Sequence, residues 1–123
     1  MTHKNSITVF YLDDEAELAE LFRDLFSTDQ ITIRSFSKVQ DFYLGLKNER
    51  PDVIFLDFRL PGITGDIIAL ELNNKIPKYL VTGELSVKTE YAFNKVLSKP
   101  FIISEIEEVF QNQLLLMAQG KAS

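Results

Sequence analysis

Residues 53–65, VIFLDFRLPGITG, join an apolar run directly to a charged residue, a turn and a helical pattern. Four apolar residues in a row are typical of a strand that is buried on both faces of a parallel sheet. Pro61 and Gly62 mark a turn, and residues 65–73 have the pattern of a helix. The stretch therefore predicts a central strand that ends near Asp57 and leads through a turn into a helix.

The same alternation of short apolar runs and longer helical segments extends along the chain in both directions. Runs rich in β-branched and aromatic residues predict strands. Five strand and helix repeats in succession favour one α/β domain, a parallel sheet covered by helices on both faces. Strands are expected at residues 7–12, 31–36, 53–56, 78–81 and 95–97.

Helices are expected after each of these strands. Ser37 with Gln40 and Ser104 with Glu107 have capping-box spacing, which predicts helices that begin at the two serines. The fourth helix is expected near residues 86–93. The expected core stripe is Leu18, Leu21, Phe22, Leu25 and Phe26 in the first helix, and Ile106, Val109, Phe110, Leu114 and Met117 in the last.

The composition describes one domain of ordinary size. Of 123 residues, 46% are hydrophobic, which can supply a normal buried core. Net charge is −5 and no cluster of Lys and Arg is present, so direct nucleic-acid binding is not expected. The chain has no cysteine, which excludes disulfides and thiol chemistry, and the apolar run 7–12 is too short to span a membrane. We expect a single cytoplasmic domain over 1–123, with a core at about 6–118 and a tail at 119–123.

Polar side chains follow four of the five predicted strands. Asp13 and Asp14 follow the first strand, Asp57 the third, Thr82 the fourth and Lys99 the fifth. The carboxyl ends of parallel strands meet at one edge of the sheet, where ligands bind. Each residue alone has an ordinary explanation as a turn former, a cap or a solvated charge. However, two carboxylates about 4 Å apart repel by roughly 4 kcal/mol, so three of them together predict a neutralising cation.

The oxygen-rich set predicts Mg²⁺ as that cation. His3 is the only histidine and lies in the N-terminal tail, so nothing favours zinc. Beside a metal, a carboxylate can attack phosphorus and form an acyl phosphate, and Asp57 is the candidate because it follows the most apolar strand. Lys99 would neutralise the phosphoryl oxygens, and Thr82 would donate a hydrogen bond to one of them.

Four motifs in order resemble the receiver domain of two-component response regulators, as in the single-domain chemotaxis regulators. They are YLDDE at 11–15, DFRLPGITG at 57–65, the Thr82 and Gly83 pair, and KPF at 99–101. The resemblance covers nearly the whole chain. It implies a flavodoxin-like, doubly wound sheet with strand order 2-1-3-4-5, a fold of which the chemotaxis regulator is itself an example.

The resemblance also implies a role for each matching residue. Asp57 would be the phosphoacceptor, supplied by a sensor histidine kinase, a histidine phosphotransfer protein or a small phosphodonor. Asp14 would bind Mg²⁺ directly and Asp13 through a water molecule, and the backbone carbonyl of Arg59 would complete the protein ligands. The chain would then act as a phosphorelay receiver without an output domain of its own, not as an enzyme with an external substrate.

Two departures from the family pattern concern how a signal would leave the domain. In the family, Thr82 and Lys99 would couple phosphorylation to a face built from the fourth helix, the fifth strand and the last helix. The family usually has Tyr or Phe three residues before this lysine, and here Val96 stands there. The segment between Thr82 and Lys99 is also short by more than one helical turn. We therefore expect another output surface, toward an unidentified partner protein or, through Leu115 and Leu116 on the last helix, a second copy of the chain.

Arg59 and Glu84 are expected to flank the path of a water molecule that attacks the acyl phosphate. They would pair across the pocket mouth and slow hydrolysis, although two solvated surface charges explain their presence equally simply.

Two other functional classes compete with the phosphorylated receiver. One is an interaction module that keeps the fold without phosphorylation, but a disused pocket has no reason to retain three mutually repelling carboxylates. The other is an aspartyl-phosphate phosphohydrolase of the haloacid dehalogenase type. Those enzymes usually carry a second Asp two residues after the nucleophile, where this chain has Arg59.

Overall fold

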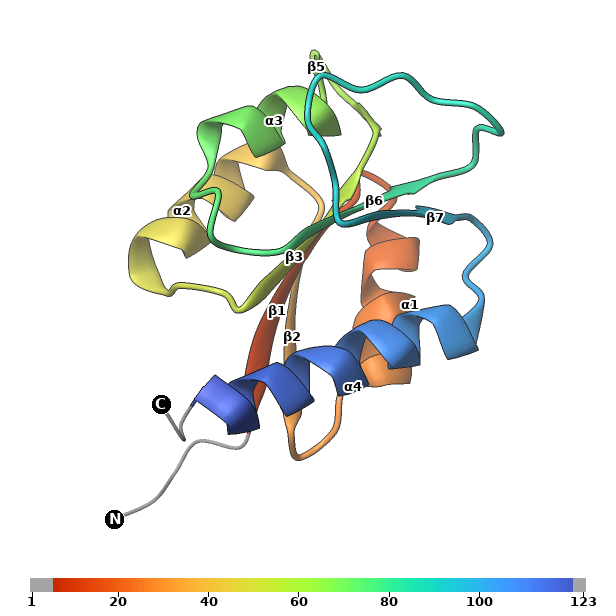
Figure 1. Cartoon of the computed structure of the whole chain (residues 1–123). Coiled ribbons are helices and arrows are strands. Elements are labelled where there is room, and N and C mark those ends of the chain that lie inside the picture. Colours follow the sequence, from red (N-terminus) through yellow and green to blue (C-terminus); the bar gives the residue numbers. More distant parts are fainter. Residues whose placement is uncertain (1–5, 121–123) are drawn as a thin grey trace.

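The computed structural model describes residues 6–120, in which a five-stranded parallel sheet lies between two pairs of helices (Figure 1). All four neighbouring strand pairs are parallel, and the order is β2-β1-β3-β6-β7. This is the predicted order 2-1-3-4-5, so the fold class is confirmed. The strands of the sheet are β1 (Ile7–Leu12), β2 (Ile31–Phe36), β3 (Val53–Asp57), β6 (Lys78–Thr82) and β7 (Lys95–Ser98).

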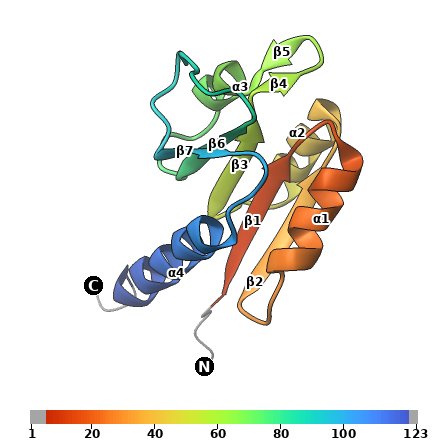
Figure 2. The same cartoon turned by 90° about the vertical axis from the view of Figure 1, so that its right-hand side faces the viewer.

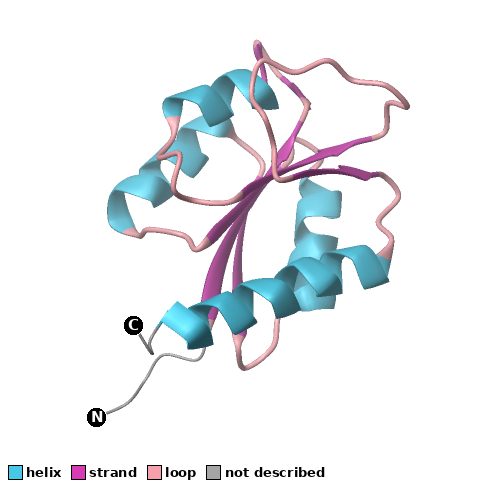
Figure 3. Ribbon diagram, in the orientation of Figure 1, coloured by secondary structure: helices cyan, strands magenta, loops and turns pink. Residues whose placement is uncertain are grey.

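Helices cover both faces of the sheet because strand side chains alternate between the two faces. Tyr11 and Phe55 face α1 (Ala16–Phe26) and α4 (Ile103–Gly120), and belong to one buried cluster. Phe10 and Ile54 face α2 (Val39–Asn48) and α3 (Gly65–Glu71) in a second cluster. Figures 2 and 3 show the two helix pairs on opposite sides of the sheet.

The buried stripe of α1 differs from the predicted one. Ala19, Phe22 and Phe26 are buried, while Leu21 and Leu25 are about half exposed. A narrow stripe is enough because α4 covers the same face of the sheet, and Phe110 of α4 contacts both phenylalanines. In α4 the predicted stripe is confirmed, with its first three members buried and the last two packed against the same cluster.

Both capping-box predictions were wrong. The N-cap of α2 is Lys38, without a side-chain cap, and Ser104 lies inside α4. The α4 helix also extends to Gly120, beyond the predicted start of the tail. His3 and residues 121–123 lie outside the described residues. Among the helices of residues 6–120, none combines the length and the apolar character that a membrane span requires.

The predicted helix near 86–93 is also wrong, since residues 83–94 form an irregular loop between β6 and β7. Side chains from two other elements hold this loop. Oδ2 of buried Asp66 in α3 accepts a 2.8 Å hydrogen bond from the Glu90 amide. The ammonium of fully buried Lys78 donates to the Asn73 and Ile76 carbonyls, at 2.6 and 3.0 Å, and lies 3.3 Å from the Tyr91 hydroxyl. These long-range contacts give the segment a fixed place without a helix.

A small hairpin, β4 (Arg59–Leu60) with β5 (Ile63–Thr64), follows β3 and was not predicted. Pro61 and Gly62 form its turn, and Gly62 has a φ of 75°, which glycine adopts without strain. Gly65 begins α3 against the end of β3, and its amide donates to the Phe58 carbonyl at 2.9 Å. A Cβ on Gly65 would clash with the Asp57 carbonyl oxygen. This glycine therefore lets α3 start directly beside the end of β3.

Candidate functional site

The predicted site residues meet at the carboxyl edge of the sheet, as expected. Asp13 directly follows β1, Asp57 and Thr82 are the last residues of β3 and β6, and Lys99 directly follows β7. Asp57, Thr82 and Lys99 line an open cavity of about 330 Å³, while Asp13 is buried and does not line it. Its lining residues are Asp14, Glu15, Asp57, Arg59, Thr82, Gly83, Glu84 and Lys99.

Lys99 joins two of the carboxylates. Its ammonium nitrogen lies 2.7 Å from Asp13 Oδ2 and 3.1 Å from Asp57 Oδ1, with Glu15 Oε1 at 3.8 Å. The Lys99 amide also donates to the Thr82 carbonyl at 2.9 Å, which fixes the lysine against the end of β6. One cation thus lies between the candidate nucleophile and a candidate metal ligand.

Asp13 is completely buried beneath this lysine. Its Oδ2 accepts a second hydrogen bond, from the Tyr11 hydroxyl at 2.7 Å, and its Oδ1 accepts one from the Glu15 amide at 3.0 Å. Asp14, by contrast, is exposed and lines the cavity. Direct metal binding by Asp14 and water-mediated binding by Asp13 stay predictions.

Burial raises the pKa of Asp57 to about 7, and the negative charge of Asp13 adds to the effect, while Lys99 opposes it. Burial alone would lower the pKa of Lys99, but its bonds to Asp13 and Asp57 outweigh that effect and raise it. The positive charge of Lys99 therefore only partly offsets the burial of Asp57 and its repulsion from Asp13.

The donor set fits a hard divalent cation. Asp13, Asp14 and Asp57 each offer a carboxylate oxygen, and these oxygens lie within 4.8 Å of one another. Oxygen-only donors suit Mg²⁺, and a cation among them would offset the repulsion that raises the Asp57 pKa. The Arg59 backbone carbonyl as a further ligand stays a prediction.

The predicted pairing of Arg59 with Glu84 at the cavity mouth is confirmed. Arg59 donates from Nε to Glu84 Oε2 at 2.8 Å and from Nη2 to Oε1 at 3.1 Å. The Glu84 amide donates to Thr82 Oγ1 at 3.1 Å, so the buried Thr82 hydroxyl is already engaged at the cavity floor. Its own proton can still be donated to a group in the cavity.

Sequence reasoning missed Tyr11 and Glu15 as parts of the site. A signal for Tyr11 was present, since residues two apart on a strand share a face and a buried tyrosine hydroxyl needs a partner. Glu15 takes part through its main-chain amide, which donates to Asp13, and through its carboxylate, which lies 3.8 Å from the Lys99 ammonium. It carried no comparable signal, because both contacts depend on the fold of the turn after β1.

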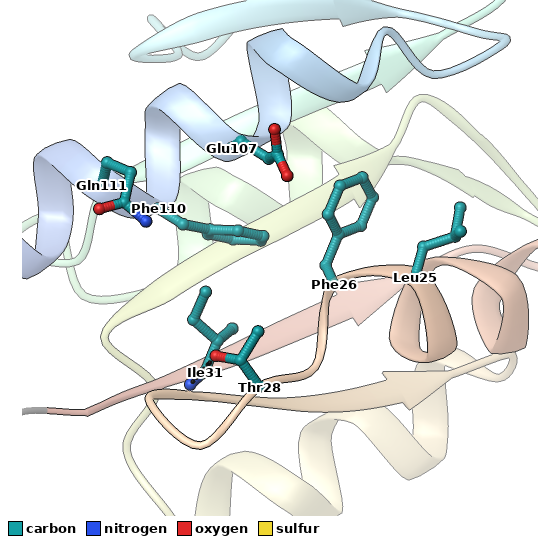
Figure 4. Close-up of a pocket in the computed structure, with 7 residues that line it drawn as sticks. All are labelled: Leu25, Phe26, Thr28, Ile31, Glu107, Phe110 and Gln111. Atoms are coloured by element: carbon teal, nitrogen blue, oxygen red, sulfur yellow. Dashed lines mark hydrogen bonds between the residues drawn. The ribbon is translucent and has the colours of Figure 1, made fainter.

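A second hollow, of about 280 Å³, lies between the end of α1 and α4 (Figure 4). The rings of Phe26 and Phe110 point into it, and Glu107 and Gln111 lie along its α4 side. It has no converging carboxylates or cation among its lining residues. The lining of this hollow therefore differs from the set of carboxylates, hydroxyl and lysine at the carboxyl edge of the sheet.

The sequence was also compared with known protein families and curated proteins. The family model of the response regulator receiver domain matches residues 9–111. The chain belongs to this family. It is 27% identical over 122 residues to the probable transcriptional regulatory protein TcrX of Mycobacterium tuberculosis, covering 93% of this chain and 51% of TcrX. It is 28% identical over 79 residues to the C4-dicarboxylate transport transcriptional regulatory protein DctD of Rhizobium meliloti, covering 62% of this chain and 17% of DctD. The receiver thus spans about half of one relative's length and under a fifth of the other's.

Solved receiver structures share the fold. A signal receiver domain from Pseudomonas fluorescens superposes with a TM-score of 0.81 at 16% identity, covering 99% of this chain and 96% of that one. The Thermotoga maritima response regulator TrrA, solved with Mg²⁺ and beryllofluoride, superposes with a TM-score of 0.74 at 20% identity, covering 87% of this chain and 98% of that one. Family and fold agree with the resemblance seen in the sequence.

Proposed function

We propose that residues 1–123 form a single receiver domain that is phosphorylated on Asp57 with the help of Mg²⁺ and signals by binding a partner protein. The observation that carries the proposal is the position of Lys99, which lies 3.1 Å from Asp57 Oδ1 in a cavity that Thr82 and Asp14 also line. A nucleophilic carboxylate, a cation for the phosphoryl oxygens and a hydroxyl donor are then within one small space.

Each residue of the pocket has one chemical task in the proposed reaction. An Asp57 oxygen attacks the phosphorus of the donor, a P–O or P–N bond to the donor breaks, and the donor leaves with the bonding electrons. Lys99 and Thr82 would hold the phosphoryl oxygens. Bound Mg²⁺, held by Asp13, Asp14, Asp57 and the Arg59 carbonyl, would supply positive charge against the developing phosphoryl charge.

The proposed donors are a sensor histidine kinase, a histidine phosphotransfer protein or a small phosphodonor. The protein is then not an enzyme with an external substrate. Its own chemistry is limited to accepting the phosphoryl group and losing it to water, which restores the Asp57 carboxylate and releases phosphate. The proposal includes a cytoplasmic location, no direct contact with nucleic acid, and either an unidentified downstream protein or a second copy of this chain as partner.

Intact mass spectrometry after incubation with acetyl phosphate tests this function. We expect one added phosphoryl group in the presence of Mg²⁺, and none with a chelator or in Asp57→Asn. An unmodified wild type would refute the proposal. Modification of Asp57→Asn to the wild-type extent would refute the choice of Asp57.

A further inference from the structure

Tyr11 brings a hydroxyl to the most deeply buried carboxylate of the pocket. Its Oη donates to Asp13 Oδ2 at 2.7 Å, and the Lys99 ammonium contacts the same oxygen at the same distance. Asp13 has no exposed surface. Two donors of different kinds, one neutral and one charged, therefore share one buried oxygen atom.

The position of the Tyr11 hydroxyl is fixed by its ring. Tyr11 is fully buried, and its ring centroid lies 4.3 Å from that of Phe22, with Phe101 and Phe55 at 6.1 and 6.4 Å. Rings packed on several sides leave little rotamer freedom. The hydroxyl is therefore preorganised to meet Asp13.

Lys99, unlike Tyr11, has alternatives to Asp13. Its ammonium also lies 3.1 Å from Asp57 Oδ1, and the proposed function moves it onto the phosphoryl group that Asp57 carries. As Lys99 moves, Asp13 Oδ2 loses a charged donor in a fully buried place. A buried carboxylate oxygen that loses its donor is costly, so a second donor on the same oxygen makes the transfer of Lys99 more favourable.

We propose that Tyr11 is a positioning residue, which keeps Asp13 Oδ2 hydrogen-bonded while Lys99 moves from Asp13 to the phosphoryl group on Asp57. The inference rests on the proposed function, and it adds to that function a residue outside the five that define the pocket. It also gives an aromatic residue a direct link to the pocket in a chain where Val96 stands at the usual aromatic position.

The test compares Tyr11→Phe with a matched control. Tyr43→Phe removes a hydroxyl that donates to Glu71 Oε1 at 2.6 Å, which is also a tyrosine–carboxylate bond but lies on the α2 and α3 side of the sheet. Affinity for beryllofluoride, a mimic of the phosphoryl group, is measured by titration at saturating Mg²⁺. We expect about a tenfold loss in Tyr11→Phe, the size typical of groups that support a metal ligand, and no change in Tyr43→Phe.

The outcomes separate this inference from the proposed function. If the wild type binds beryllofluoride and Tyr11→Phe binds it equally well, the role of Tyr11 is refuted and the function stands. If the wild type does not bind beryllofluoride with Mg²⁺, the proposed function and the inference both fail.

A measurement on the wild type removes any dependence on how the variant folds. A buried, hydrogen-bonded tyrosine hydroxyl proton exchanges slowly with water and can be followed by NMR, with assignment through the Tyr11 ring. We expect this resonance to persist when Mg²⁺ and beryllofluoride are added, while the Lys99 side-chain resonances shift. Loss of the Tyr11 hydroxyl resonance on binding would overturn the inference, because the bond would then break with that of Lys99.

Discussion

Replacement of Asp57 by Asn should stabilise the metal-free protein at neutral and higher pH. Asp57 is 5% exposed, and its pKa is raised to about 7 by burial and by Asp13. An aspartate in an unfolded chain has a pKa of about 3.9. Because the folded state binds this proton more tightly, Asp57 lowers the free energy of unfolding as the pH rises from about 4 through about 7.

The size of the effect follows from the shift. A difference of about 3 pKa units corresponds to about 4 kcal/mol at 1.36 kcal/mol per unit, which is an upper limit because Asp13 shares the effect. We expect Asp57→Asn to match the wild type at about pH 3 to 4, where Asp57 is protonated in both the folded and the unfolded chain, and to exceed it by about 2 to 4 kcal/mol near about pH 8. For a domain of this size, total stability is on the order of 6 to 18 kcal/mol, so the difference is measurable.

Urea denaturation followed by circular dichroism, with a chelator present, measures this difference across the pH range. Titrating groups remote from Asp57 change both proteins alike, so the wild type serves as the control at every pH. Added Mg²⁺ should stabilise the wild type more than the variant, because the variant lacks one carboxylate ligand. The reasoning is refuted if the two proteins show parallel pH profiles, or if Asp57→Asn is the less stable one near about pH 8.

Three further predictions concern the metal, the cavity mouth and the output surface. Asp14→Ala should abolish stabilisation by Mg²⁺ and raise metal-free stability by about 1 kcal/mol at most, since Asp14 is exposed. A wild type whose melting temperature does not change when Mg²⁺ is added would contradict the metal site. Arg59→Ala and Glu84→Ala should each shorten the phosphoryl lifetime by up to about fivefold, the limit set by an exposed ion pair. Arg34→Ala serves as a control, because it breaks a similar exposed ion pair with Glu49 that is remote from the cavity. Equal phosphoryl lifetimes in the wild type and all three variants would mean that Arg59 and Glu84 are plain surface charges. Leu115→Glu should abolish any dimer that light scattering detects with beryllofluoride, whereas Leu70→Glu, at a similarly exposed leucine of α3, should not; a monomer in every sample would exclude the dimer.

The sheet was predictable because its signals are local. Continuous apolar runs such as residues 53–56 identify buried strands, and the polar residue after each run marks the edge where a parallel sheet binds ligands. The strands β3, β6 and β7 each proved one residue longer than predicted, with Asp57 and Thr82 inside their strands. A strand's last residue depends on its neighbour's hydrogen bonds, which a single sequence does not display.

The loop between β6 and β7 was mispredicted because its structure depends on distant residues. Asp66 binds the Glu90 amide across 24 positions, and Lys78 reaches Tyr91 across 13. The capping boxes failed for a related reason, since their spacing is a preference that tertiary packing readily overrides. Tertiary packing also decided which face of α1 is buried. Leu21 and Leu25 are half exposed because the position of α4 left them outside the shared core.

The three aspartates, the threonine and the lysine of the pocket could be predicted from the sequence, because each of them lies at or just after the end of a strand. Tyr11 was hidden by its surroundings in the sequence, where it continues an apolar strand and reads as core. The structure shows that it is both core and pocket, with its ring among Phe22, Phe55 and Phe101 and its hydroxyl on Asp13.

The central claim is that Asp57, among three clustered carboxylates, is the one that takes the phosphoryl group. Borohydride reduces an acyl phosphate to an alcohol and leaves free carboxylates intact, so it marks the phosphorylated aspartate as homoserine. After treatment with acetyl phosphate and Mg²⁺, borohydride reduction and digestion, the account predicts homoserine at position 57 and unmodified aspartate at Asp13 and Asp14. Homoserine at position 13 or 14, or at none of the three, would contradict it.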